Sequence, residues 1–436
     1  MAAFLLIALI VLAGAVLASR AVDIRLVLGA AAFLLFVVAG DVAPFFVTFA
    51  GEMANPRTVV PICSAMGFAY VVRATGCERH LVHLLVMPLR RVRSLLVPGG
   101  VAVGWTVNTA IVSQSSTAAT VGPVLVPVVT AAGIPLATAG AMLLLGSSAG
   151  GELVNPGAVE VVTLSTLTGA APTATVARLL GANLIASITA VAVFWFLAVR
   201  RPPAPPERSV ETDAEPADDE PADGEPFRAN PFKALVPLVP LAILFALPAL
   251  VTLPESLSTS IMIGAAMLAG VALAAVAVPS KAATLATPFF EGAGFAYARV
   301  ISLIVTATLF TEAIKANGII EAMSATVASR PAVMTVAAVC LPLLLAAVSG
   351  SGIAPAVAVM KVLVPIAAAA EMDATRVGVL CAVSAQLGRT MSPAAAVVMM
   401  SSAVSGVQPH ELLRRVVVPL LSGALALLVA GLLGLV

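Results

Sequence analysis

Residues 332–369 read AVMTVAAVCLPLLLAAVSGSGIAPAVAVMKVLVPIAAA, two apolar runs separated by the small polar segment SGSGIAP at 349–355. A helix of about 17–25 apolar residues crosses the hydrocarbon core of a bilayer. Gly and Ser let the chain leave the helical conformation, and Pro355 removes a helix hydrogen bond. The stretch therefore predicts two membrane-embedded helices that meet at a hairpin tip.

The same apolar character extends along the whole chain. Of its 436 residues, 60% are hydrophobic and 10% are charged, and the mean hydropathy is +1.09. A soluble domain carries about 25% charged residues. We therefore expect an all-α polytopic membrane protein, whose first apolar run, Phe4–Leu17, is a spanning helix because no positive residue precedes it. The apolar runs lie near 3–18, 26–40, 58–72, 96–112, 118–132, 135–168, 174–199, 234–250, 257–278, 296–313, 332–348, 354–369, 374–404 and 412–435.

Composition excludes several classes of function. The net charge of +1 provides no basic field for nucleic acid. The four cysteines are scattered without paired spacing, and the three histidines lie in polar connecting segments. We therefore expect no disulfide framework, metal site or haem. No GxxxxGK[ST] segment occurs, so ATP use is not indicated.

The chain divides into two halves that resemble each other. A polar stretch at 200–233, rich in Pro, Asp and Glu, predicts a disordered linker between repeats at 1–199 and 234–436. Three features of the first half recur 237 residues later: Asn155-Pro156 as Ser392-Pro393, Pro172 as Pro409, and Arg178 as Arg415. Internal duplication in a membrane protein is typical of secondary transporters.

The distribution of Lys and Arg predicts the orientation of the repeats. If the 96–112 and 118–132 runs form a re-entrant hairpin, most basic residues and the linker fall on the cytoplasmic side of the membrane. The second half then runs opposite to the first. We therefore expect two inverted-topology repeats, each with a re-entrant hairpin and a broken transmembrane helix. Residues 77–93 carry a leucine face and a basic face, which fits a helix in the membrane interface or a solvated connection equally well.

Four irregular polar segments interrupt the apolar runs at matching places of the two halves. Irregular backbone at membrane depth is tolerated only around a cavity. Broken helices present free N–H groups to an anion, while freed carbonyls can hold a cation. The segments are Ser113–Thr117, Gly146–Gly157, Ser349–Pro355 and Gln386–Pro393. Their pairing favours a binding site over simple packing of small residues.

These segments supply the candidate site residues. We expect the substrate to contact Ser115, Ser116, Thr117, Asn155, Ser349, Gly350, Ser351, Gly352, Arg389, Thr390 and Ser392. We expect a coupling cation or proton at Ser113, Gly146, Ser148 and Glu152.

Charged residues within apolar runs are functional candidates because they are costly in a bilayer. Arg389 is the best fixed charge for a substrate carboxylate, or else forms a structural ion pair with Glu152 or Glu160. Glu152 could carry a proton. Lys361 could instead extend towards a membrane interface.

Two motifs resemble a known family. Gly350-Ser351-Gly352-x-Ala354-Pro355, followed by Leu387-Gly388-Arg389-Thr390-x-Ser392-Pro393, resembles the DcuC family of C4-dicarboxylate carriers. The resemblance implies membership of the wider ion-transporter superfamily, with inverted repeats, a homodimer and a transport unit that moves past a fixed scaffold. It also implies substrates such as succinate, fumarate or malate, moved by exchange, uniport or cation symport.

Taken together, these features predict a secondary active transporter of C4-dicarboxylates in the cell inner membrane, working by alternating access. It needs no cofactor beyond a possible coupling Na⁺ or H⁺. The alternatives are a cation/proton antiporter or a metalloid-anion carrier on the same scaffold. An intramembrane enzyme would need a catalytic set such as a dyad of Ser349 or Ser351 with Lys361, which the repeat symmetry disfavours.

Overall fold

The computed structural model describes residues 23–91, 96–199, 227–250, 259–328 and 330–436, and these ranges contain helices and turns but no strand. The expected helix at 3–18 and most of the expected linker at 200–233 lie outside the described residues. The all-helical expectation is confirmed for the described part of the chain.

Most of the helices lie within the apolar runs of the sequence. They are α2 (Ile24–Ala39), α3 (Ala43–Met53), α4 (Pro56–Thr75), α5 (Cys77–Val86), α6 (Leu96–Ala110), α7 (Gln114–Ala131), α8 (Leu136–Ser148), α9 (Val159–Thr168), α10 (Pro172–Val199), α11 (Pro231–Leu235), α12 (Val239–Leu250), α13 (Thr259–Ala277), α14 (Ala286–Ala296), α15 (Ser302–Ala316), α16 (Ile319–Ala328), α17 (Pro331–Ser349), α18 (Ile353–Ala369), α19 (Ala374–Thr390), α20 (Ala396–Ser405) and α21 (Pro409–Leu432).

Six of the described helical segments are long and apolar enough to cross a membrane. They are Pro56–Thr75, Pro172–Ala198, Ser260–Ala277, Ala286–Ala316, Pro331–Ser349 and Pro409–Leu432. The fourth of these joins α14 to α15 through a π-helical turn at Tyr297–Ile301. These segments, with the apolar composition, agree with a polytopic membrane protein.

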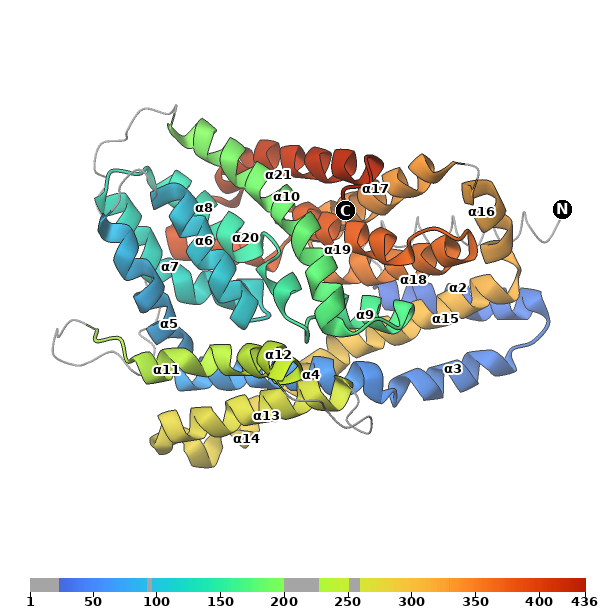
Figure 1. Cartoon of the computed structure of the whole chain (residues 1–436), viewed down its shortest axis with the longest axis horizontal. Coiled ribbons are helices and arrows are strands. Elements are labelled where there is room, and N and C mark those ends of the chain that lie inside the picture. The colour runs from blue at the N-terminus through green and yellow to red at the C-terminus, as the bar shows by residue number, and fades with distance from the viewer. Residues whose placement is uncertain (1–22, 92–95, 200–226, 251–258, 329) are drawn as a thin grey trace.

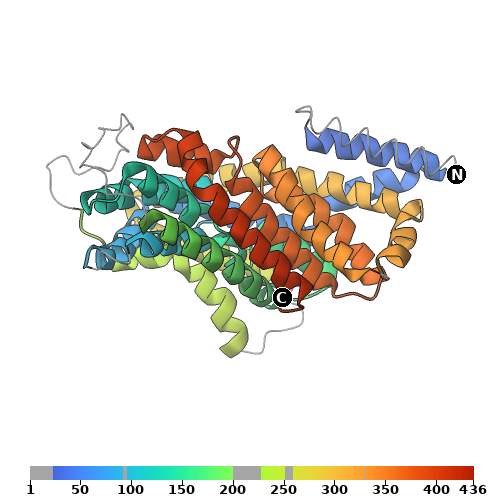
Figure 2. The ribbon, with the colours of Figure 1, turned by 90° about the horizontal axis from the view of Figure 1, so that it is seen from above.

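The helices form two groups. The α4 group consists of α2–α4 and α11–α15, and it lies along the lower side of the molecule in Figure 1. The α19 group consists of α6–α10 and α17–α21, and it forms the upper side. Within the α4 group, α4 packs on α13 and α14, while α15 packs on α2 and α3. Figure 2 shows α21, in dark red, crossing over the middle of the molecule, with the blue helices α2 and α3 at one end.

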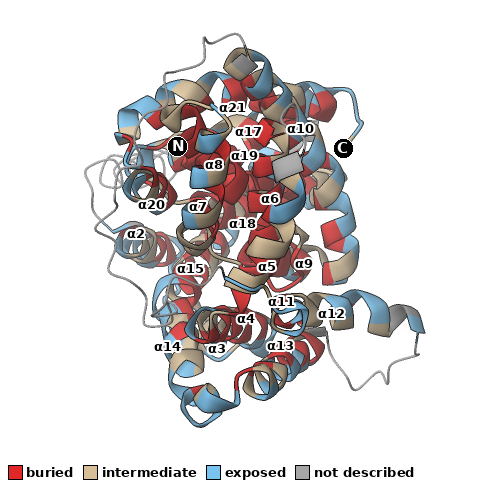
Figure 3. Cartoon of the chain, turned by 90° about the vertical axis from the view of Figure 1, so that its left-hand side faces the viewer, coloured by how far each residue is buried: buried red, intermediate tan, exposed pale blue. Residues whose placement is uncertain are grey.

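The α19 group holds the most buried helices. Every residue of α19 from Val377 to Thr390 and of α8 from Thr138 to Ser148 is buried, and Figure 3 shows this burial at the centre of the molecule. Both helices end at the centre, because Gly150 adopts a left-handed φ of +80° after α8 and a non-helical stretch at 391–395 follows α19. The expected interruptions of the two long apolar runs are therefore confirmed as helix breaks.

The two expected tips are also helix breaks. Ser113 caps α7, because its hydroxyl accepts a hydrogen bond from the amide of Ser116 at 3.4 Å. Gly350 ends α17 with a left-handed φ of +72°, and a Cβ there would lie 2.8 Å from the carbonyl carbon of Ala394. Glycine is thus required both by the turn and by the close approach of the break after α19.

The 77–93 segment begins with α5, which is a packed connecting helix. Its buried residues include Glu78, Leu81 and Val82, and it packs on α6, α7 and α11. Its leucine face is partly buried, with Leu81 buried and Leu84, Leu85 and Leu89 half-buried. Burial raises the pKa of the Glu78 carboxyl to about 7.

Candidate functional site

The site lies where the ends of α8 and α19 meet. The hydroxyls of Ser148, the last residue of α8, and Thr390, the last residue of α19, are 2.6 Å apart. The Arg389 guanidinium also donates through Nη2 to the Ser148 carbonyl at 3.1 Å and to its hydroxyl at 3.2 Å. Two segments that are far apart in the sequence are thus joined at their breaks.

A buried ion pair lies at this junction. Nη1 of Arg389 is 3.1 Å from Oε1 of Glu152, and their side chains are 5% and 1% exposed. This is the structural ion pair that the sequence left open as an alternative role for Arg389. A charge buried without a partner is costly, so each of these groups stabilises the other.

The first tip contacts this ion pair. Gln114, the first residue of α7, donates its side-chain amide to Oε2 of Glu152. The side-chain oxygen of Asn108, on α6, accepts the backbone N–H of Glu152 at 3.0 Å. Glu152 is therefore held by both arms of the α6–α7 pair as well as by Arg389.

The second tip approaches the guanidinium directly. A Cβ on Gly352 would be 2.9 Å from Nη1 of Arg389 and 3.1 Å from Oε1 of Gln386. A larger residue at this position would require the Arg389 and Gln386 side chains to shift. Oε1 of Gln386 and Nε of Arg389 are both buried without hydrogen-bond partners. Two polar atoms beside this tip are therefore unpaired.

The carbonyls freed at the α8 break are satisfied by α10. Asn183 donates to the carbonyl of Gly150 at 2.7 Å, and Ser187 donates to the carbonyl of Ala149 at 2.9 Å. Buried backbone groups need such partners when a helix is broken. The break is therefore supported by polar residues of a neighbouring helix.

Several expected site residues hold the breaks in place. Asn155 donates to the carbonyl of Thr109 at 3.1 Å and accepts the N–H of Gly157 at 2.9 Å. The Thr117 hydroxyl donates to the Ser113 carbonyl at 2.9 Å. Ser392 accepts the N–H of Ala394 at 3.3 Å. These contacts fix the local backbone around the ion pair.

The other expected residues lie at different distances from the pair. Gly146 is where α8 packs closely on α6, since a Cβ there would lie 2.8 Å from the carbonyl oxygen of Val101. Ser349 is exposed, and its hydroxyl bonds within its own tip, at 3.3 Å from the N–H of Ser351. Ser115 and Ser116 are half-buried at the start of α7.

The expectation for Lys361 is wrong. Its side chain is buried instead of extending to an exposed surface. Its ammonium group donates to the hydroxyl of Thr308 on α15. Neither Ser349 nor Ser351 is its hydrogen-bond partner, so the Ser–Lys dyad is not formed.

Sequence reasoning did not select three residues of the site, Asn108, Gln114 and Gln386, and it named Glu160 only as a possible ion-pair partner of Arg389. Gln386 donates through Nε2 to Oε1 of Glu160 at 2.7 Å. Both glutamines stand inside the polar segments quoted above, and Asn108 is an isolated amide within an apolar helix. A polar amide side chain at membrane depth is the signal that would have identified Asn108, Gln114 and Gln386.

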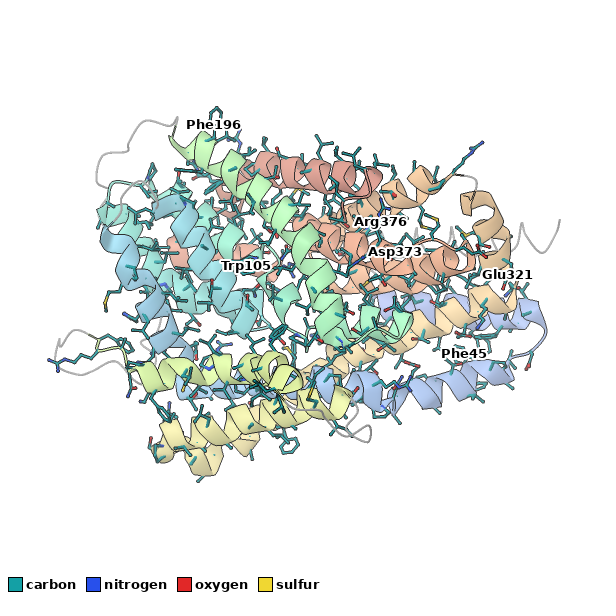
Figure 4. The ribbon with its side chains drawn as sticks, viewed as in Figure 1. Phe45, Trp105, Phe196, Glu321, Asp373 and Arg376 are labelled. Carbon is teal, nitrogen blue, oxygen red and sulfur yellow. The ribbon has the colours of Figure 1, made fainter. Side chains whose placement is uncertain are left out.

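Figure 4 labels residues on α6 and α19, two helices that contribute to the site. Trp105 lies on α6 near the centre of the molecule, and Asp373 and Arg376 lie at the beginning of α19. A Cβ on Gly151 would lie 2.3 Å from the Trp105 carbonyl oxygen, so α6 approaches the α8 break closely. Among the described residues, no group of three His, Cys, Asp or Glu side chains could hold a metal ion.

Membrane-length helices around a polar, charge-paired centre built from broken segments are an arrangement typical of membrane transport proteins. The model of the C4-dicarboxylate anaerobic carrier family, DcuC, matches residues 58–436. The chain belongs to this family.

Individual relatives match shorter parts of the chain. An uncharacterized transporter of Haemophilus influenzae is 45% identical over 92 residues, which cover 21% of this chain and 63% of that protein. The anaerobic C4-dicarboxylate transporter DcuC of Escherichia coli is 27% identical over 144 residues, 32% of this chain and 31% of that protein. The chain thus spans less than two thirds of the length of these curated relatives.

Proposed function

We propose that this protein is a secondary carrier for C4-dicarboxylates such as succinate, and that Arg389 binds a substrate carboxylate. The observation that supports this most directly is the buried guanidinium beside the second tip, paired with a carboxylate that the first tip contacts. A guanidinium matches a carboxylate in shape and charge. A substrate carboxylate would replace Glu152 at Arg389, and the backbone N–H groups of the tips would complete the contacts. Membership of the C4-dicarboxylate carrier family supports the substrate class.

We further propose two inverted-topology repeats with re-entrant hairpins at α6–α7 and α17–α18. Exchanged packing supports the repeat: α2 and α3 pack on α15, whereas α13 and α14 pack on α4. The last helices of the two halves, α10 and α21, pack on each other. Glu152 and Arg389 are also 237 residues apart, the spacing at which Asn155-Pro156 recurs as Ser392-Pro393. The ion pair would then join equivalent positions of the two repeats.

In this proposal, alternating access comes from movement of the α19 group along the α4 group. The segregation of the helices into these groups supports it, because all contacts around the ion pair lie within the α19 group. We propose an inner-membrane location with the 200–233 linker in the cytoplasm, from the distribution of basic residues. A homodimer is proposed from the family resemblance.

Counterflow of labelled succinate in proteoliposomes tests this function. The wild-type protein should show saturable counterflow, and the double variant Arg389→Ala/Glu152→Gln, which leaves no unpaired charge, should show none. Arg330→Ala, at an exposed position outside the site, should behave as wild type. The absence of wild-type counterflow would refute the proposal. Transport of arsenite, or Na⁺-dependent proton flux, would then support the metalloid-anion or antiporter alternative.

A further inference from the structure

A second buried carboxyl lies beside the ion pair. Glu160 is in the first turn of α9 and is 1% exposed. Its hydrogen bond comes from the neutral amide of Gln386, one helical turn before Arg389. Oε1 of that amide is buried and has no hydrogen-bond partner. Glu160 is therefore held by an amide that also has a free acceptor.

The charges that act on Glu160 are those of Glu152 and Arg389. Other ionisable groups on the helices packed against α9 have different surroundings. Arg178 of α10 pairs with Asp373 at the surface, and Lys361 of α18 donates to Thr308. The remaining basic residues on these helices are Arg57 and Arg73 of α4, which are exposed, and Arg376 of α19, which lies at the opposite end of its helix from Arg389.

The cluster therefore has two carboxyl groups for one guanidinium. Arg389 is committed to Glu152 at 3.1 Å, so an ionised Glu160 would be a buried charge without its own cation. Such a charge is costly to bury, and a buried group avoids this cost by binding a proton. A protonated Glu160 can donate to the free Oε1 of Gln386 if the amide rotates.

We infer that Glu160 is the proton-binding residue of this carrier and that its proton is transported together with the dicarboxylate. The inference rests on the proposed function, since it assigns the coupling ion of the same site. The proton is taken from water and returned to water on the side to which the site is open, so only an O–H bond forms and breaks.

Competition for one guanidinium provides the coupling. An ionised Glu160 repels a substrate carboxylate at Arg389, whereas a protonated Glu160 does not. Substrate and proton therefore favour each other's binding, and by linkage the effect is the same in both directions. The chain would release both together when the site opens to the opposite side.

Transport in proteoliposomes at zero membrane potential separates this inference from the proposed function. Counterflow of succinate without a pH gradient reports the carrier itself. An inward proton gradient of one pH unit should make the wild type accumulate succinate about tenfold for each proton transported. Glu160→Gln should abolish this accumulation relative to its own counterflow. Glu411→Gln, at an exposed position in the first turn of α21, should accumulate succinate as wild type does.

The outcomes are distinct. Wild-type counterflow without accumulation would overturn the proton inference and leave the carrier intact. Gradient-driven accumulation by Glu160→Gln would also overturn it. No counterflow by the wild type would refute the carrier itself.

Infrared spectroscopy provides a test that does not require an active variant. In mildly acidic solution, where Glu78 contributes equally to both spectra, subtraction of the Glu160→Gln spectrum from that of the wild type should leave the C=O stretch of a protonated carboxyl group, and added succinate should perturb this band. Glu160→Gln should lack the band, and Glu411→Gln should retain it. A difference spectrum without the band would overturn the inference.

Discussion

Removing the guanidinium of Arg389 should destabilise the protein through its partner, Glu152. Arg389→Ala leaves the Glu152 carboxyl, in a side chain that is 1% exposed, without its cation and with the Gln114 amide as its remaining side-chain partner. Breaking a buried pair from one side costs about 3–5 kcal/mol. The variant also loses the two hydrogen bonds from Arg389 to Ser148.

The double variant Arg389→Ala/Glu152→Gln should recover much of this loss. The neutral amide no longer requires a cation, and groups in direct contact couple by about 0.5–3 kcal/mol. Thermal unfolding can be followed in detergent with a thiol-reactive dye, because Cys77 and Cys381 are buried and react only on unfolding. We expect the wild type to have the highest melting temperature, the double variant an intermediate one and Arg389→Ala the lowest.

The exposed variant Arg330→Ala controls for the loss of a positive charge as such and should melt as wild type does. If Arg389→Ala has the same melting temperature as the wild type, the ion pair does not stabilise the protein. A double variant that melts no higher than Arg389→Ala would show that the cost does not come from the orphaned carboxylate. Either result refutes the reasoning.

Three further predictions concern stability. Burial raises the pKa of Glu78 from its ordinary 4.5 to about 7. The stabilisation that the folded protein gains from neutral Glu78 is therefore complete below pH 4.5 and is lost as the pH rises through 7. In Glu78→Gln, the melting temperature should depend less on pH over this range. Gly350 and Gly133 both have a positive φ, but only Gly350 lies close to other backbone atoms. Gly133→Ala should lower the free energy of unfolding by roughly 1–2 kcal/mol, and Gly350→Ala should lower it by more. Denaturant titration of the two variants measures both changes. Arg178→Gln breaks a half-exposed ion pair with Asp373. It should lower the free energy of unfolding by less than about 1 kcal/mol, and by nothing in high salt, because solvent and salt screen exposed charges. Melting temperatures measured at low and high salt test this.

The helix breaks were predictable because their causes are local. Gly350 has a positive φ, and Ser113 caps a helix, so the sequence around each break carries the signal itself. The pair of Arg389 with Glu152 was foreseen as an alternative, because few charged residues fall within apolar runs and each needs a partner. The centre of the site could therefore be located from local helix-breaking residues and from the small number of charged residues in the apolar runs.

The remaining contacts depend on the three-dimensional arrangement. Gln386 reaches Glu160 across 226 residues, and Lys361 reaches Thr308 across 53. Neither spacing follows from helical periodicity. The short helices α3, α14 and α16 were also not expected, because their runs are too short to cross a bilayer alone. Their positions depend on packing against longer helices from both halves of the chain.

The pairing of Arg389 with the chain's own carboxylate bears on how the proposed carrier can work. An empty site with an unpaired buried guanidinium would be costly, and such a charge would bind a dicarboxylate too tightly to release it. Because Glu152 occupies Arg389 at 3.1 Å, substrate entry exchanges one carboxylate for another. The net gain in free energy is then small, and the empty site keeps its charges paired. A carrier that must both reorient when empty and release substrate on either side benefits from this exchange.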